Sequence, residues 1–161
     1  MSRKKIEMVM GPIADKLDLP PLSQICFVVT DLRKAAYRLR AVGIGPFVFP
    51  EIHYTDVRYY GNPSGGYWKM AFARWGVTEL ELACSVREPS IYQDFLNENG
   101  EGFHHFGFDI KNLDAYVEKA GRLGYSVMMS GRTSSGGFAH LDTRELCGVI
   151  LEVIERKAPR V

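Results

Sequence analysis

The sequence contains a weak internal repeat, which constrains the fold more than any other feature of the chain. Residues 24–43 align without a gap with residues 105–124, and each copy begins with apolar residues at alternate positions, the period of a strand with one buried face. The apolar spacing then becomes helical, after a residue type that favours a helix N-cap: Asp31 in the first copy and Asn112 in the second. A glycine stands where each helix is expected to end. The repeat therefore predicts two similar strand–helix units.

Each predicted helix is followed by three segments with strand patterns, separated by turns rich in Gly, Ser and Asn. We predict these strands at residues 52–60, 67–75 and 78–84 in the first half, and at 125–130, 138–142 and 149–155 in the second, with a loop at 131–137. This order predicts an α+β fold of two βαβββ modules within one domain. The expected boundaries are an N-terminal arm at 1–21, a first module at 22–88, a linker with a short helix at 89–101 and a second module at 102–161.

The composition argues against several classes of protein. No stretch is long and apolar enough to cross a bilayer or to act as a cleaved signal, so we expect a cytoplasmic protein with no membrane partner. The formal net charge is only +1, with Lys and Arg scattered among Asp and Glu, which argues against nucleic acid as a partner. Three cysteines at wide spacings fit neither a disulfide framework nor a paired-cysteine metal site, and we expect reduced thiols in strands.

Four polar residues stand at strand positions that call for an explanation. Gln24 and His105 begin the two repeated strands with the opposite parity to the apolar residues under the helices, so they face the other side of the sheet. Glu81 and Glu152 lie in the last strand of each half; Glu152 stands between two isoleucines, where an ionised carboxylate is costly to bury without a partner such as a metal ion. Taken singly, a strand His is more often structural and a strand Glu more often faces solvent. Because both halves carry ligand-type residues at the same positions, twofold packing would bring the four together, and we expect a metal site.

Three segments resemble the vicinal oxygen chelate superfamily, which includes glyoxalase I, methylmalonyl-CoA epimerase, extradiol dioxygenases and bleomycin-resistance proteins. These segments are residues 22–32, 99–108 and 148–155, and the Gly-Glu-Gly-x-His-His pattern that begins at Gly100 is the most specific of them. The likeness is closest to the epimerase-like and glyoxalase-like branch and covers residues 22–156. It implies paired βαβββ modules that form a cleft-bearing, partly open mixed β-sheet barrel, and it favours a homodimer.

The resemblance also implies a set of metal ligands. Carried over by position, the ligands of one divalent metal ion, of type Co, Mn, Fe, Ni, Mg or Zn, are Gln24, Glu81, His105 and Glu152. In the epimerases the first of these is commonly His, which Gln24 replaces here. An error of strand register would instead select Glu79 or Glu155, and His104 has the wrong parity and is expected to be structural.

A metal site of this kind favours enolisation of a carbonyl substrate. The metal acts as a Lewis acid, the α-proton becomes more acidic, and Glu81 or Glu152 is the expected catalytic base. We therefore expect a metal-dependent epimerase or isomerase, or a glyoxalase-like lyase, that acts on a small molecule: an acyl-CoA such as methylmalonyl-CoA, or an adduct of a 2-oxo compound. Arg58 and His140 are candidates for contacting an anionic or carbonyl group of that substrate.

Two other functions stay open. A metal-free protein of the bleomycin-resistance type would use the same cleft to bind or sequester a small molecule. An extradiol-type dioxygenase is the second, but non-haem iron oxygenases usually bind iron with two histidines and one carboxylate, and Gln24 stands at the place of the first histidine.

Overall fold

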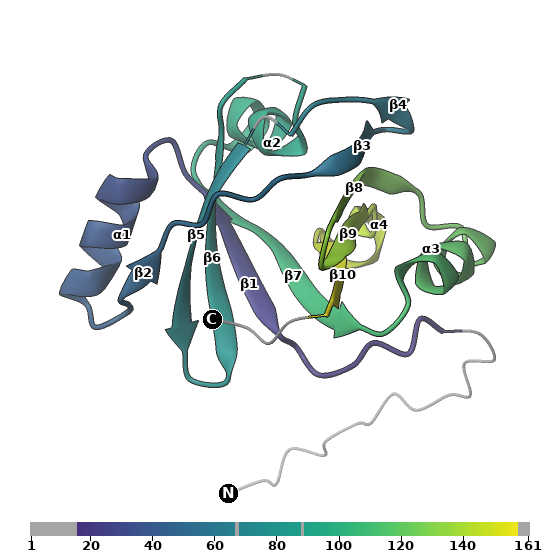
Figure 1. Ribbon diagram of the computed structural model, residues 1–161, viewed down its shortest axis with the longest axis horizontal. Helices are drawn as coiled ribbons and strands as arrows, with labels where there is room; N and C mark the ends of the chain where they lie inside the picture. Colours follow the sequence, from purple (N-terminus) through teal and green to yellow (C-terminus); the bar gives the residue numbers. More distant parts are fainter. Residues whose placement is uncertain (1–15, 67, 88, 158–161) are drawn as a thin grey trace, which may run out of the picture.

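The computed structural model describes residues 16–66, 68–87 and 89–157 (Figure 1). Its helices are α1 (Leu32–Ala41), α2 (Ile91–Asn99), α3 (Leu113–Arg122) and α4 (Arg144–Cys147). The strands before α2 are β1 (Gln24–Val28), β2 (Phe47–Val48), β3 (Thr55–Tyr59), β4 (Asn62–Pro63), β5 (Trp68–Trp75) and β6 (Thr78–Ser85). The strands after α2 are β7 (Gly102–Ile110), β8 (Val127–Thr133), β9 (Gly136–Leu141) and β10 (Ile150–Arg156). Residues 1–15 of the predicted N-terminal arm lie outside the described residues.

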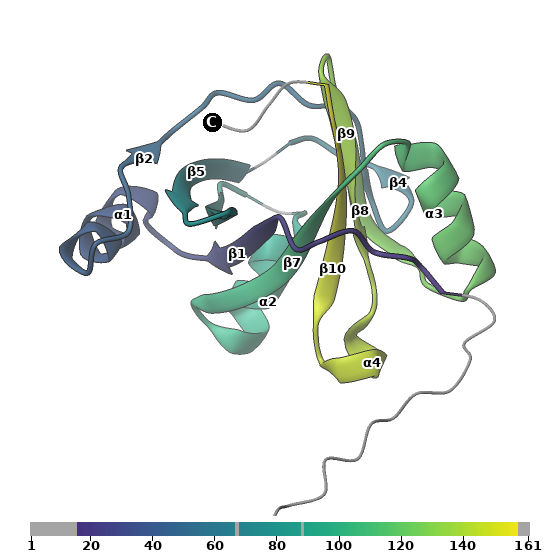
Figure 2. The same ribbon diagram turned by 90° about the horizontal axis from the view of Figure 1, so that it is seen from below.

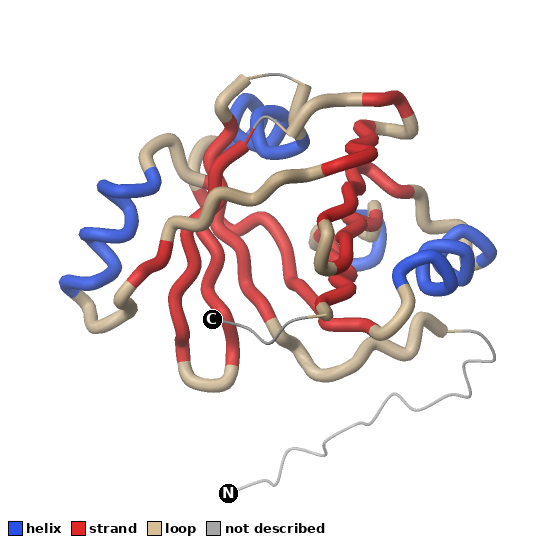
Figure 3. The backbone as a smooth tube through the Cα atoms, viewed as in Figure 1, coloured by secondary structure: helices blue, strands red, loops and turns tan. Residues whose placement is uncertain are grey.

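The two helices of the internal repeat begin where the repeat predicts. The Asp31 side chain accepts a hydrogen bond from the Lys34 backbone N–H at 3.0 Å, and the Asn112 side chain accepts one from the Ala115 N–H at the same distance. Each cap satisfies a backbone donor that the helix itself leaves unpaired. The apolar faces of α1 and α3 pack on the outside of the sheet, over β5 and β6 and over β9 and β10 respectively (Figure 3).

All ten strands form one mixed sheet in the order β2-β5-β6-β1-β7-β10-β9-β8-β3-β4. The sheet curves strongly but is not closed (Figures 1 and 2). Strand β1 pairs in parallel with β6 and antiparallel with β7, and β7 pairs in parallel with β10, so these four strands form the centre of the sheet. The predicted α+β fold with a partly open mixed sheet is confirmed. No helix in the described part of the chain is long and apolar enough to cross a membrane.

The predicted loop at 131–137 is wrong, because this segment forms the turn end of a β-hairpin and only residues 134 and 135 lie between its strands. Strand β8 continues to Thr133 and β9 begins at Gly136. Glycine permits the pairing: a Cβ on Gly131 would lie 2.8 Å from the Phe138 ring, and a Cβ on Gly137 would lie 2.7 Å from the Gly131 carbonyl oxygen. The glycines that suggested a loop therefore serve close packing within a sheet.

The first half also departs from the predicted strand pattern. Strand β3 begins at Thr55 rather than at residue 52, and it pairs with β8 of the second half. Residues 49–54 consequently run from β2, the strand at one end of the sheet, to β3, which is next to the strand at the other end (Figures 1 and 2). A further difference is that Cys147 lies in α4 and not in a strand.

Candidate functional site

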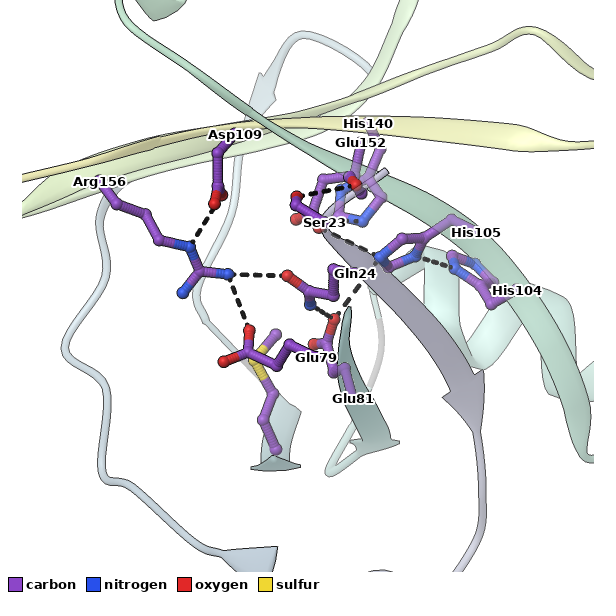
Figure 4. Close-up of polar contacts among 12 residues, drawn as sticks. Ser23, Gln24, Glu79, Glu81, His104, His105, Asp109, His140, Glu152 and Arg156 are labelled. Atoms are coloured by element: carbon purple, nitrogen blue, oxygen red, sulfur yellow. Dashed lines mark hydrogen bonds and ion pairs between the residues drawn. The ribbon is translucent and has the colours of Figure 1, made fainter. Parts of the chain in front are cut away.

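The four residues predicted as metal ligands lie on four adjacent strands. Gln24 is on β1, Glu81 on β6, His105 on β7 and Glu152 on β10, and these strands are consecutive in the sheet. All four side chains are between 0 and 5% exposed. Strand alternation explains the convergence. Leu80, Leu82 and Val153 point outward under the helices, so Glu81, between the two leucines, and Glu152, next to Val153, point inward. The structure therefore brings the four side chains together (Figure 4).

Polar contacts join these four side chains directly. The Gln24 amide nitrogen donates a hydrogen bond to Glu81 Oε2. His105 Nε2 lies 3.5 Å from Glu81 Oε2 and 3.1 Å from Glu152 Oε2. One imidazole nitrogen thus stands between two buried carboxylates, at the centre of the cluster.

His140 belongs to the same cluster. It lies directly opposite Glu152 in the antiparallel pairing of β9 and β10, and its Nε2 is 3.5 Å from Glu152 Oε1. Its ring centroid is 4.7 Å from that of His105. His140 is fully buried and does not line the cavity beside the cluster, so it contacts the other polar side chains and not an open substrate space.

Arg58, the other residue predicted to contact the substrate, lies away from this cluster. Its neighbour Val57 is buried in the interior core, so strand alternation turns the Arg58 side chain outward. There it is exposed and forms an ion pair with Asp56 at 2.9 Å. We assign Arg58 no role at the site.

His104 is buried beside His105, although strand alternation assigns it to the other face. A β-bulge explains the difference: Cys26 on β1 pairs with His105 and Phe27 pairs with Phe103, so His104 is the extra residue between them. The Nδ1 atoms of His104 and His105 are 2.8 Å apart. When His105 donates from Nδ1 across this contact, its Nε2 presents a lone pair to the carboxylates, which is the tautomer that binds a metal.

Arg156 is a component of the site that the sequence did not reveal. Its Nη2 donates to Gln24 Oε1 at 2.7 Å and to Glu79 Oε1 at 3.1 Å, and its Nε donates to Asp109 at 3.2 Å (Figure 4). Strand alternation could have found it, because Arg156 has the same parity on β10 as Glu152. The structure also shows where Glu79 and Glu155 lie, the two residues that an error of strand register would have selected as ligands. Glu79 binds Arg156, and Glu155 faces outward, where its Oε2 accepts a hydrogen bond from the Leu113 N–H at 2.8 Å.

A cavity of about 370 Å³ opens beside the cluster. It is lined by polar groups of Gln24, Glu81, Glu152 and Arg156 and by the larger side chains of Tyr54, Met70, Phe72 and Phe138. A cavity of this size, largely apolar with a few converging polar groups, is typical of a small-molecule site.

Burial shapes the protonation of the cluster. Burial raises the pKa of Glu152 and lowers the pKa of His140 well below its ordinary value, and the charge of His105 lowers the latter further. Burial alone would lower the pKa of His105, but its interactions with Cys26 and Glu152 outweigh burial and raise this pKa well above the ordinary value. Burial raises the pKa of the Cys26 thiol to about 12, with a further contribution from Glu81, so the thiol stays protonated.

The donor atoms of the cluster fit a divalent metal ion. In the described part of the chain, His105 Nε2, His140 Nε2 and Glu152 Oε2 are buried and make no hydrogen bond of acceptable geometry. Ligand atoms of His105, His140 and Glu152 all lie within 4.8 Å of one another. Buried polar atoms without partners are rare in proteins, and a cation would satisfy all three at once.

Comparison with solved structures places the fold among known proteins. Methylmalonyl-CoA epimerase from Mycobacterium tuberculosis superimposes with a TM-score of 0.65 at 18% identity, over 92% of this chain and 94% of that one. A variant of the Streptomyces coelicolor methylmalonyl-CoA epimerase, in complex with 2-nitronate-propionyl-CoA, gives 0.65 at 23% identity, over 88% and 100%. A hypothetical protein from Bacillus halodurans C-125 gives 0.64 at 19% identity, over 87% and 96%.

Sequence comparison identifies the family. A search of curated proteins found no match to this chain. The model of the glyoxalase/bleomycin resistance protein/dioxygenase superfamily matches residues 23–140, well over half of the sequence and the region that contains three of the four central strands. The chain therefore belongs to the glyoxalase/bleomycin resistance protein/dioxygenase superfamily.

Proposed function

We propose that this protein is a divalent-metal-dependent enzyme that removes a proton next to a carbonyl group of a small molecule, as an epimerase, isomerase or glyoxalase-like lyase. The observation that carries the proposal is the position of His105 Nε2 between two buried carboxylates, Glu81 and Glu152, beside a cavity of about 370 Å³. In a protein that only binds an apolar ligand, such a cluster would destabilise the fold without serving the ligand. Its presence favours a catalytic metal site.

Glu81, His105 and Glu152 are the residues that we propose to hold the metal. Two carboxylates would balance the charge of a divalent cation, and a hydrogen bond donated by His105 Nδ1 to His104 would leave Nε2 free to bind. When bound, the metal supplies Lewis acidity that makes the α-proton of a substrate carbonyl easier to remove.

Glu152 is the residue that we propose as the base. Glu81 Oε2 is already engaged by the Gln24 hydrogen bond, whereas Glu152 Oε2, 3.1 Å from His105 Nε2, makes no hydrogen bond of acceptable geometry to any described residue. Glu152 also lines the cavity, where its carboxylate can accept an α-proton from a substrate and return it. Return of the proton by Glu152 to a neighbouring atom gives isomerisation. Epimerisation needs a second acid that protonates the opposite face of the substrate, and Glu81, which lines the same cavity, would supply it.

The cavity walls assist this chemistry. Met70, Phe72 and Phe138 surround the polar groups with apolar surface, which excludes water and strengthens the interaction of each charge with the substrate. Arg156, at the edge of the same cavity, holds the Gln24 amide in place and provides positive charge near a substrate anion.

An acyl-CoA is the substrate class that we propose to test first, and an adduct of a 2-oxo compound second. The support is that structures of similar fold include a methylmalonyl-CoA epimerase in complex with methylmalonyl-CoA. The cavity of about 370 Å³ suits a small acyl group, with the remainder of a larger molecule outside it. A homodimer in the cytoplasm completes the proposal.

The test measures exchange of the α-proton for deuterium. Protein loaded with Co²⁺ is incubated in D₂O with methylmalonyl-CoA or with a 2-oxo compound and a thiol, and exchange is followed by NMR. We expect metal-dependent exchange that Glu152→Gln abolishes and that Glu155→Gln, the same change on the same strand but on the opposite face, retains. Absence of bound metal combined with tight binding of a small ligand would instead identify a sequestering protein, and metal-dependent oxygen uptake with a catechol would identify a dioxygenase.

A further inference from the structure

We infer that His140, and not Gln24, supplies the remaining protein ligand of the metal, so that the centre has two imidazoles and two carboxylates. This inference rests on the proposed metal site and defines its chemistry. It departs from the ligand set that the family resemblance implies, because that set contains the amide of Gln24.

The geometry of β9 and β10 places His140 at the cluster. The antiparallel register pairs His140 directly with Glu152, so their side chains leave the sheet side by side on its inner face. His140 Nε2 is 3.5 Å from Glu152 Oε1, and the His140 ring meets the His105 ring edge to face. Both imidazoles therefore converge on one carboxylate (Figure 4).

His140 also has an unmet need for a partner. Its side chain is fully buried, and within residues 16–66, 68–87 and 89–157 nothing forms a hydrogen bond with its Nε2. A buried imidazole nitrogen without a partner destabilises the folded state, and a metal ion at the cluster removes that cost.

Gln24, in contrast, has both ends of its amide occupied. A glutamine binds a metal through Oε1, and this oxygen accepts a hydrogen bond from Arg156 at 2.7 Å, while the amide nitrogen donates to Glu81. Turning the amide over would bring its N–H₂ group against the guanidinium, two donors facing each other. Arg156 is itself fixed by Glu79 and Asp109, so it cannot easily release the oxygen.

Packing restricts Gln24 in the same way. It lies against Gly107 of β7 so closely that a Cβ added to this glycine would be 2.8 Å from Gln24 Cβ. The Gln24 side chain is 2% exposed, and this contact fixes where it leaves β1. Gln24 is therefore a positioning residue that orients Glu81.

The proposed ligand set determines which metals bind. Two imidazole nitrogens with two carboxylates suit Fe²⁺, Co²⁺, Ni²⁺ and Zn²⁺, whereas Mg²⁺ and Ca²⁺ prefer sites made of oxygen. We expect the protein to bind Co²⁺ at least about 100-fold more tightly than Mg²⁺.

The decisive experiment counts the coordinated imidazoles. Cu²⁺ is bound to the intact protein, and electron spin echo envelope modulation counts imidazoles from their remote nitrogens; Co²⁺ affinity is measured by calorimetry. The variants are His140→Gln, Gln24→Met and His53→Gln, the last removing the exposed histidine of the cavity rim. We expect two imidazoles in the wild type, in Gln24→Met and in His53→Gln, and one in His140→Gln, with Co²⁺ affinity reduced about 10-fold or more only in His140→Gln.

Several outcomes would overturn the inference. One imidazole in the wild type would do so without any variant, which covers the case in which His140→Gln does not fold. Loss of Co²⁺ affinity in Gln24→Met but not in His140→Gln would assign the ligand to Gln24. Absence of metal binding would overturn this inference and the proposed function together, whereas two imidazoles without proton exchange would support the inference and reject only the proposed reaction.

Discussion

Replacement of Glu152 by Gln separates a metal site from a structural ion pair. In the metal-free protein, Glu152 is buried, and its Oε2 makes no hydrogen bond among the described residues. Burial raises its pKa above the ordinary value of 4.5, so the folded state favours the neutral acid. The protonated carboxyl group of Glu152 therefore contributes fully to the free energy of unfolding below pH 4.5, and this contribution is lost as the pH rises through the raised pKa. Gln resembles the neutral acid, so the variant escapes this loss.

The expected sizes follow from the burial of the site. A buried polar atom without a partner costs about 1–3 kcal/mol, and each kcal/mol shifts the Tm of a chain of 161 residues by about 2–4 °C. At neutral pH, with chelator present, we therefore expect Glu152→Gln to melt at least about 2 °C above the wild type. With Co²⁺ at 100 times its Kd, the wild type gains about 2.7 kcal/mol, a rise of about 5–11 °C, whereas the variant gains less than about 2 °C.

Differential scanning fluorimetry with and without metal measures both effects. Glu155→Gln is the matched control: it weakens the hydrogen bond to the Leu113 N–H and lowers both melting temperatures by a similar amount, and the rise with Co²⁺ persists. A metal-free Glu152→Gln variant that melts more than about 6 °C below the wild type would identify a structural ion pair, because breaking a buried pair costs about 3–5 kcal/mol. An undiminished rise with Co²⁺ would remove Glu152 from the ligands.

Three further predictions concern the scaffold. Gly136→Ala is expected to lose on the order of 3 kcal/mol of unfolding free energy in urea titration, because the new Cβ would lie 1.8 Å from a backbone oxygen of β10. The control Gly124→Ala, whose new Cβ would meet no atom within 4 Å, is expected to lose only about 1 kcal/mol. Equal losses in the two variants would refute the clash at Gly136. Iodoacetamide followed by peptide mass spectrometry should label half-buried Cys84 before Cys26, whose pKa of about 12 and full burial protect it; early labelling of Cys26 would contradict its burial. Asp31→Ala should cost about 1 kcal/mol through loss of the α1 cap, and Asp31→Asn should restore most of it; no change on Asp31→Ala would show that the cap does not stabilise the helix.

Local patterns in the sequence predicted much of the fold. The two N-caps and the helical spacing after them located α1 and α3, because capping and amphipathic spacing act within a few residues. Strand alternation placed Gln24, Glu81 and Glu152 on the inner face, since alternation follows from the backbone alone. The pairing of β3 with β8 was not predictable, because residues far apart in the chain decide it.

The same distinction explains His104 and His105. Alternation assigned them to opposite faces, yet both are buried in the interior, because the pairing of β1 with β7 contains a bulge. A bulge depends on how two strands align, and the sequence of one strand does not show it. The consequence is functional, since the bulge lets His104 contact Nδ1 of His105 and fix the nitrogen that faces the carboxylates.

The roles that we infer for Gln24 and His140 differ from those carried over from the superfamily by strand position, for a related reason. Position on a strand shows which face a side chain occupies, but a metal selects the donor atoms that no other group has already engaged. Arg156 engages the Gln24 oxygen, and Arg156 is recognised only when the end of β10 is seen beside β1 and β6. The register of β9 against β10 places His140 beside Glu152, with its Nε2 making no hydrogen bond of acceptable geometry to the described residues. The ligand set of this superfamily member thus depends on contacts between strands, so a chain that keeps Gln24 but lacks Arg156 should bind its metal through the amide.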